Sequence, residues 1–153
     1  GINSRKIIDY KSGCKMSRVS LSSDRMAKDL KKYGVVPNKS LKTFLPKLKN
    51  NNMYKHLIRG YFDGNGAVYT LNDKYDTLCF GFYGTHKIVK QIQNELIQKI
   101  GISNNKITDQ KTHNVSFSSY SKHKDINNFY NYIYKNAELF LKRKKEKFEK
   151  KIS

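Results

Sequence analysis

Short stretches of alternating apolar and polar residues open the chain and predict two strands. The segments 6–9 and 16–22 carry this pattern, and the residues between them predict a tight turn, so we expect a hairpin. Asp24 then begins a helix that runs to about Tyr33, with Gly34 as the residue just beyond its end. The start of the chain is therefore expected to be a hairpin followed by one helix.

The pattern resumes from residue 52 as two further hairpins separated and followed by helices. The predicted elements are a helix from Asn52, strands at 67–72 and 77–85, a helix at 87–100, strands at 106–110 and 114–120, a helix at 122–135 and a last helix from Ala137. In the helix at 87–100, apolar residues recur every four positions, Thr85 is a suitable N-cap and Gly101 ends the pattern. Four mainly antiparallel strands with one apolar face predict an α+β domain whose helices cover that face and leave the other open.

An internal repeat connects the two ends of the chain. Residues 19–23, Val-Ser-Leu-Ser-Ser, return at 115–119 as Val-Ser-Phe-Ser-Ser, and the helical segment 28–33 resembles 124–129 at the same offset of 96 residues. One ungapped offset favours an internal duplication over chance. Residues 1–35 then resemble the tail of a preceding unit, 36–51 form an ordered connector, and 52–153 hold one complete unit that ends in a basic helix.

The charge of the chain points to a polyanionic partner. The 153 residues include 31 Lys and Arg but only 12 Asp and Glu, which gives a formal net charge of +19 and a pI near 9.9. Nucleic acid is the first candidate for such a surplus. A membrane is not expected as a partner, because no apolar run approaches the roughly 20 residues that span a bilayer and no signal-peptide pattern opens the chain. We expect a soluble intracellular protein, cytoplasmic or organellar and not secreted.

Residues 56–66, His-Leu-Ile-Arg-Gly-Tyr-Phe-Asp-Gly-Asn-Gly, are the most informative stretch. On a helix their apolar members form one stripe, made of Leu57, Ile58, Tyr61 and Phe62. Gly60 lies in the same turn without a side chain and would let another helix approach closely. The helical pattern stops at 63–66, where two glycines permit positive φ and a tight turn. A simple helix C-cap that leads into a hairpin is the alternative reading of this turn.

Residues 58–66 resemble, position by position, the nine-residue motif of the LAGLIDADG homing endonucleases. The resemblance implies an antiparallel saddle-like sheet with helices on one face, which lies in the major groove of double-stranded DNA. It also implies that the motif helix pairs with a second one through Leu57, Gly60 and Tyr61. That second half would come from an identical chain or from a portion that precedes Gly1.

The resemblance also implies a catalytic site at the end of the motif helix. In the family, the acid at the eighth position binds the metal ions that cut DNA, and Asn65 stands there in this chain. The resemblance assigns the metal ligands to Asn65 and the Gly64 carbonyl, with Mg²⁺ as the expected cofactor. Asp63 is either a further catalytic acid or a structural cap, and Lys122 is the candidate basic residue. Because an amide is a poorer ligand than a carboxylate for Mg²⁺, we expect weak cleavage by this chain alone.

Strand alternation predicts which side chains face DNA from the open side of the sheet. If Leu78, Phe80 and Phe82 are buried, the opposite face carries a mixed hydrogen-bonding set suited to base edges and phosphates. This set is Tyr69, Tyr83, Asp109, Lys111, Asn114, Ser116 and Ser118. A solvated sheet face is the alternative for this set. For the basic run 142–145, a solvated helix face is the favoured interpretation.

Two functions follow as expectations. The first is a site-specific homing endonuclease of a mobile element, encoded by an intron or intein, which hydrolyses phosphodiesters with metal and is impaired by Asn65. The second is a non-enzymatic nucleic-acid binder on the same scaffold, such as an intron maturase or a transcription regulator.

Overall fold

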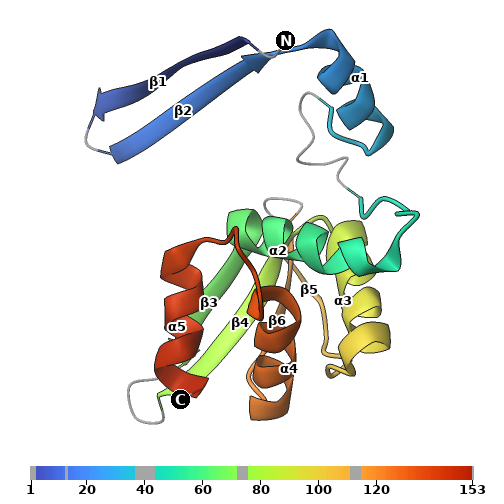
Figure 1. Cartoon of the computed structure of the whole chain (residues 1–153). Coiled ribbons are helices and arrows are strands. Elements are labelled where there is room, and N and C mark those ends of the chain that lie inside the picture. Colours follow the sequence, from blue (N-terminus) through green and yellow to red (C-terminus); the bar gives the residue numbers. More distant parts are fainter. Residues whose placement is uncertain (1–2, 13, 37–43, 72–75, 111–114, 153) are drawn as a thin grey trace. The chain divides into compact units, whose positions relative to one another are not determined.

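The computed structural model describes residues 3–12, 14–36, 44–71, 76–110 and 115–152 (Figure 1). For residues 3–12 and 14–20 the description covers the backbone. The chain divides into two compact units, residues 1–37 and 38–153, and each is described by itself. No helix among the described residues is long and apolar enough to cross a membrane.

The first unit contains the predicted hairpin and helix. Strands β1 (Asn3–Ser12) and β2 (Cys14–Ser22) pair antiparallel, and helix α1 (Asp24–Lys32) follows. The Ser23 hydroxyl oxygen caps α1 by accepting a hydrogen bond from the Met26 backbone N–H at 3.3 Å. The prediction of a hairpin followed by a helix is confirmed, with strands longer than the pattern indicated.

The second unit contains the predicted order of helix, hairpin, helix, hairpin and helices. Its elements are a short 3₁₀ helix η2 (Asn51–Met53), α2 (Tyr54–Asn65), β3 (Gly66–Leu71), β4 (Thr77–Gly84), α3 (His86–Ile100), β5 (Thr108–Gln110), β6 (Val115–Tyr120), α4 (His123–Tyr134) and α5 (Lys142–Ile152). The predicted caps of α3 are confirmed, because the Thr85 hydroxyl accepts from the Ile88 N–H and Gly101 adopts φ 63°. The last helix begins at Lys142 and not at Ala137 as predicted, and the backbone N–H of Leu141, just before it, donates a hydrogen bond to the Asp63 carboxylate.

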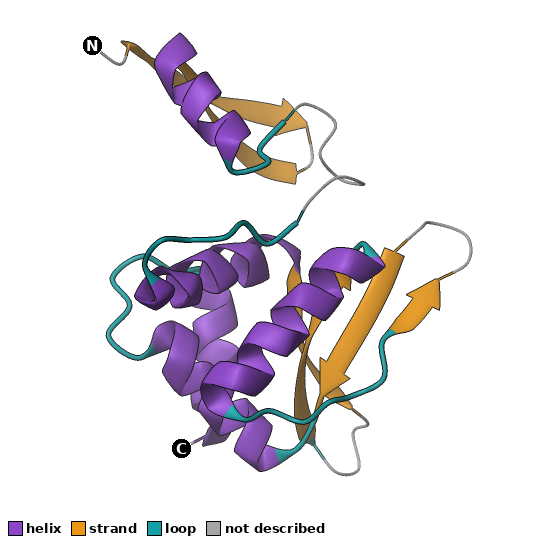
Figure 2. Ribbon diagram, turned by 90° about the vertical axis from the view of Figure 1, so that its right-hand side faces the viewer, coloured by secondary structure: helices purple, strands orange, loops and turns teal. Residues whose placement is uncertain are grey.

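The four strands form one antiparallel sheet in the order β3-β4-β6-β5. Figure 2 shows the helices of this unit on one side of the sheet, with the opposite face of the strands uncovered by the described elements. The unit is therefore an α+β domain with helices on one face, as the pattern predicts.

The core lies between the sheet and the helices and is rich in aromatic rings. Phe62 of α2, Phe80 of β4, Phe129 of α4 and Phe148 of α5 are fully buried. The rings of Phe80 and Phe129 stack in parallel, with centroids 4.1 Å apart. Burial of each such side chain stabilises the fold by roughly 1.5–3 kcal/mol, so these contacts hold the helices firmly on the inner face of the sheet.

Candidate nucleic-acid interface

The open face of the sheet carries a cluster of aromatic side chains at its centre. Strand register places Tyr69 of β3, Tyr83 of β4 and Phe117 of β6 on this face. The rings of Tyr83 and Phe117 are stacked with centroids 4.4 Å apart, and the Tyr69 ring lies 6.4 Å from that of Phe117. The Tyr69 hydroxyl forms a 2.6 Å hydrogen bond with that of Ser119. Two of the predicted DNA-facing residues, Tyr69 and Tyr83, therefore lie on the open face.

Three other residues of the predicted set lie on the opposite side. Ser118 pairs with Phe82, and Ser116 pairs with Gly84. Both serines therefore point to the side covered by the helices, and they are only 1% and 3% exposed. Asp109 pairs with Ser116 and shares its side. The prediction for these three is wrong, and Lys111 and Asn114 lie outside the described residues.

The side chains of β6 face the opposite way from the prediction, and Gly81 on the neighbouring strand is the sequence signal for this orientation. Phe117 was not expected on the open face, because large apolar side chains normally define the buried side of a strand. However, Gly81 on the neighbouring strand has no side chain, and a Cβ there would lie 2.5 Å from the Phe117 ring. The space above Gly81 accommodates Phe117, while the Tyr120 ring stacks on Phe80 in the core, with centroids 4.9 Å apart.

Asp109 forms a small polar cluster at the edge of the sheet. One of its carboxylate oxygens accepts a hydrogen bond from the Ser116 hydroxyl at 2.6 Å and lies 2.9 Å from His86 Nδ1. The hydrogen bond from Ser116, and then that from His86, lowers the pKa of this carboxyl group below its usual value. Asp109 thus ties β5 to the start of α3 and does not contribute to the centre of the open face.

The end of α2 holds the residues that the resemblance assigns to catalysis. The helix continues through Gly64 and Asn65 and ends only at Gly66, which is extended with φ −88°. The helix thus ends within the predicted segment 63–66 and leads into the hairpin, but the expected tight turn is wrong, because neither Gly64 nor Gly66 has a positive φ. Both Gly64 and Asn65 are exposed. The helix end leads directly into β3.

Asp63 has a structural role in the fold. One carboxylate oxygen accepts a hydrogen bond from the Tyr134 hydroxyl at 2.7 Å, and the other accepts from the Leu141 backbone N–H at 2.9 Å. These contacts join α2 to the end of α4 and to the segment before α5. They agree with the alternative interpretation of Asp63 as a structural cap.

Lys144 is a buried cation at the carboxyl end of α2, and sequence reasoning did not identify it. Its Nζ donates hydrogen bonds to the carbonyl oxygens of Phe62, Asp63 and Gly66 at 2.5, 2.9 and 2.6 Å. A cation at this end of a helix is stabilised by the helix dipole. Burial, and then the charge of Arg143, lowers the pKa of Lys144 below its ordinary value of 10.5. The expectation of a solvated basic face on α5 is wrong for Lys144, which is 4% exposed.

The predicted helix-pairing residues divide into two groups. Gly60 is exposed, and a Cβ built there would meet no atom within 4 Å. Gly64, one turn later, is equally open. Leu57 is half-buried, and the hydroxyl of half-buried Tyr61 donates a 2.8 Å hydrogen bond to the Tyr83 carbonyl of the same chain. Burial raises the pKa of Tyr61 to about 12. The open surface of α2 is thus centred on the two glycines.

Lys122 does not lie beside Asn65. Asn65 leads into Gly66, which pairs with Phe82, whereas Tyr120 at the end of β6 pairs with Phe80. From there the chain continues away from Asn65 to Lys122, which precedes the first residue of α4. The register therefore separates the two predicted catalytic residues along the sheet.

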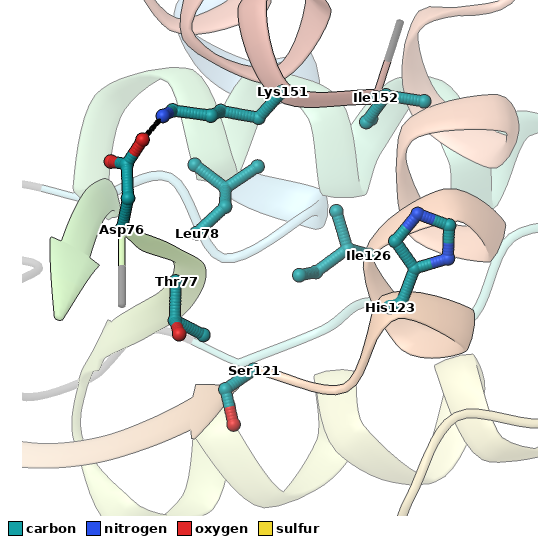
Figure 3. Close-up of a pocket in the computed structure, with 8 residues that line it drawn as sticks. All are labelled: Asp76, Thr77, Leu78, Ser121, His123, Ile126, Lys151 and Ile152. Carbon is teal, nitrogen blue, oxygen red and sulfur yellow. Dashed lines mark ion pairs between the residues drawn. The ribbon is translucent and has the colours of Figure 1, made fainter. Parts of the chain in front are cut away.

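A pocket of about 220 Å³ lies near Lys122, between the starts of β4 and α4 and the end of α5 (Figure 3). Leu78, Ile126 and Ile152 give it an apolar lining, and Lys151 on its rim forms an ion pair with Asp76. Its volume is below the roughly 300–1,000 Å³ that is typical of ligand sites. The pocket therefore does not replace the open face as the candidate site.

The donors at the end of α2 do not suit Mg²⁺ on their own. Asn65 offers an amide oxygen and Gly64 a backbone carbonyl, and both are neutral. Mg²⁺ in proteins is normally held through one or two carboxylates. Since the carboxylate of nearby Asp63 is hydrogen-bonded to Tyr134 and Leu141, a catalytic metal here would need an acid from outside this helix.

No known protein family matches the sequence, and neither does any curated protein.

Proposed function

We propose that this chain binds double-stranded DNA on a scaffold of the LAGLIDADG homing-endonuclease type, in which two motif helices pair and two sheets contact one duplex. The observation that carries the proposal is the geometry of α2. This helix exposes a glycine surface at Gly60 and Gly64, and its end leads directly into the open sheet. Pairing through the glycines would bring two open sheets together as one extended surface.

The charge supports a duplex as the ligand of that surface. A formal net charge of +19 favours a partner with many phosphates. The major groove, about 12 Å wide, admits strands as well as helices. Each neutralised phosphate adds about 0.9 to the slope of log affinity against log salt, so duplex binding should weaken steeply as salt rises.

A Gly60→Leu variant tests the pairing. Apart from the adjoining backbone of α2, no atom of the chain lies within 4 Å of the added Cβ, so the fold should tolerate the side chain, whereas a facing helix would be pushed away. We expect sedimentation velocity to show loss of the paired species, and anisotropy titrations of a mixed-sequence labelled duplex to show at least tenfold weaker binding. Asn131→Leu, at an exposed position of α4, is the matched control and should change neither. A parent chain that stays monomeric and binds duplex as tightly as Gly60→Leu contradicts the proposal.

Two functions remain on this scaffold, and Asn65 separates them. In the first, the chain is a metal-dependent endonuclease whose cleavage needs a carboxylate from another half. In the second, it binds nucleic acid without cutting, as an intron maturase or transcription regulator does. The hydrogen bonds of Asp63 favour the second function for two identical chains, because they occupy the acid nearest to Asn65.

An Asn65→Asp variant distinguishes these functions. Restoring a carboxylate at an exposed helix end should raise Mg²⁺-dependent cleavage of a plasmid library by at least tenfold if the site is an impaired endonuclease site. Duplex binding should be retained, because the contacts with the phosphates are expected to come from other residues. Asn65→Ser, which adds no charge, is the control. Equal inactivity of both variants with intact duplex binding would support the non-enzymatic function.

A further inference from the structure

The open face carries three aromatic rings that are packed together and held in place, a feature that recognition of base edges in a duplex does not require. Phe117 leans over Gly81, where a Cβ would lie 2.5 Å from its ring. Tyr83 stacks on Phe117 and is 38% exposed, so it offers ring surface to a ligand. Tyr69 is held in place by its 2.6 Å hydrogen bond to Ser119. The three rings are therefore fixed before any ligand arrives, which lowers the entropic cost of binding.

Rings of this kind match unpaired bases better than paired ones. Bases in a duplex are stacked on each other and present only their edges in the grooves. An unpaired base exposes its flat face and can stack on an aromatic side chain. Four-stranded sheets that bind single-stranded RNA use surface aromatics in this way to stack two or three bases. Three of the side chains expected to read base edges, Asp109, Ser116 and Ser118, lie on the other side of the sheet.

We infer that the open face is a stacking platform for unpaired bases, with Tyr83 as the outermost ring, and that the chain binds single-stranded nucleic acid there. The net charge of +19 supplies the attraction for the phosphates of the strand. The inference shares with the proposed function only the assignment of this face to nucleic acid. It needs neither pairing of α2 nor cleavage.

Anisotropy titrations with labelled strands of about 10 nucleotides test the inference. The probes are a mixed-sequence DNA strand, the RNA of the same sequence, an abasic strand of equal length and charge, and the corresponding duplex. Base-bearing strands should bind the parent chain about tenfold more tightly than the abasic strand, because stacking on an aromatic ring contributes strongly to each base contact. This comparison uses the parent chain and is independent of any effect of mutation on folding.

Substitutions then locate the platform. Tyr83→Leu and Phe117→Leu should each weaken binding of the base-bearing strand about tenfold and leave binding of the abasic strand unchanged. Tyr83→Phe, which keeps the ring, should restore most of the affinity. Tyr33→Leu replaces another exposed tyrosine, located in the first unit, and is the matched control. A 2-aminopurine base in the strand should be quenched on binding to the parent chain and not on binding to Tyr83→Leu.

The outcomes separate this inference from the proposed function. Base-dependent binding of either strand supports the inference, and the tighter of DNA and RNA identifies the natural ligand. If Gly60→Leu abolishes duplex binding and leaves base-dependent binding of the single strand intact, that result supports both the proposed function and the stacking platform. Equal affinity for abasic and base-bearing strands, or unchanged affinity of the two Leu variants, overturns the inference even if duplex binding is strong.

Discussion

The two copies of the internal repeat have similar sequences but different surroundings. Leu30 of α1 and Tyr33, the C-cap of that helix, correspond at an offset of 96 residues to Ile126 and Phe129 of α4. Within the described parts of the chain, Leu30 and Tyr33 are 41% and 52% exposed, whereas Ile126 and Phe129 are 4% and 0% exposed. The same apolar positions therefore form a surface in one unit and a core in the other.

The difference shows which part of the structure is local. Both copies form a strand followed by a helix, because alternation and capping act over a few residues. Burial of Phe129 depends on partners from distant segments, with Phe62 and Phe80 at centroid distances of 4.9 and 4.1 Å. The first unit consists of two strands and one helix and has no described counterpart of α2, β4 or α5. Its apolar positions lack these partners.

The junction between strand and helix also differs between the copies. In the first unit the strand ends at Ser22 and the helix begins at Asp24, whereas β6 continues to Tyr120, the counterpart of Asp24. Tyr120 is fully buried and stacks on Phe80 at an interplanar angle of 17°. Tertiary packing thus extends the strand where the local sequence of the first copy starts a helix.

Replacement of the two equivalent aromatic residues should give the largest contrast. Phe129→Ala leaves a cavity between α4 and the sheet and should lower the free energy of unfolding by about 3–5 kcal/mol. Tyr33→Ala removes an exposed ring and should change it by about 0.5 kcal/mol or less. Urea denaturation followed by circular dichroism measures both, and Phe129→Leu should give an intermediate loss. A loss for Tyr33→Ala that equals that for Phe129→Ala would show that a partner covers α1 in solution.

Much of the second unit was predictable from sequence, because its signals are local. The positions of α3, β3 and β4 follow from apolar periodicity, and the α3 caps follow from Thr85 and Gly101. The faces of β3 and β4 were also predicted correctly, since Phe80 and Phe82 mark the buried side.

The errors concern contacts between distant segments. The orientation of β6 depends on the space above Gly81 and on the stacking of Tyr120, neither of which is visible within β6 itself. The extension of α2 through Gly64 involves Lys144, which is 78 residues from Gly66 along the chain. The pattern of apolar and polar residues cannot show that such distant residues are in contact. Lys144 also stands among other lysines in α5, and nothing in the neighbouring sequence distinguishes it from the exposed ones.

Lys144 is the next test of the comparison, because it belongs to α5, an element without a described counterpart in the first unit. Lys144→Met keeps the length of the side chain and removes the ammonium donor from the carbonyl oxygens of Phe62, Asp63 and Gly66, of which that of Phe62 still accepts from the Gly66 N–H. We expect the free energy of unfolding to fall by about 1–3 kcal/mol, the usual cost of a buried group that loses its hydrogen-bond partner. Lys150→Met, at an exposed position of the same helix, should have little effect. A parent-like stability of Lys144→Met would show that the helix end does not need this cation.

The dependence of this difference on pH tests whether Lys144 is desolvated as the structure indicates. Its pKa in the folded chain lies below the ordinary value of 10.5, so between these two values the unfolded chain binds more protons than the folded chain. In that pH range, the contribution of Lys144 to the free energy of unfolding must therefore increase as the pH rises. The stability difference between the parent and Lys144→Met should therefore be smallest at neutral pH and widen towards about pH 10, where the other lysines and the tyrosines contribute to both chains alike. Urea titrations of the two chains at several pH values measure this trend. A difference that narrows as the pH rises would mean that the three carbonyl oxygens raise the pKa of Lys144, so that its ammonium group stabilises the end of α2 more than burial penalises it.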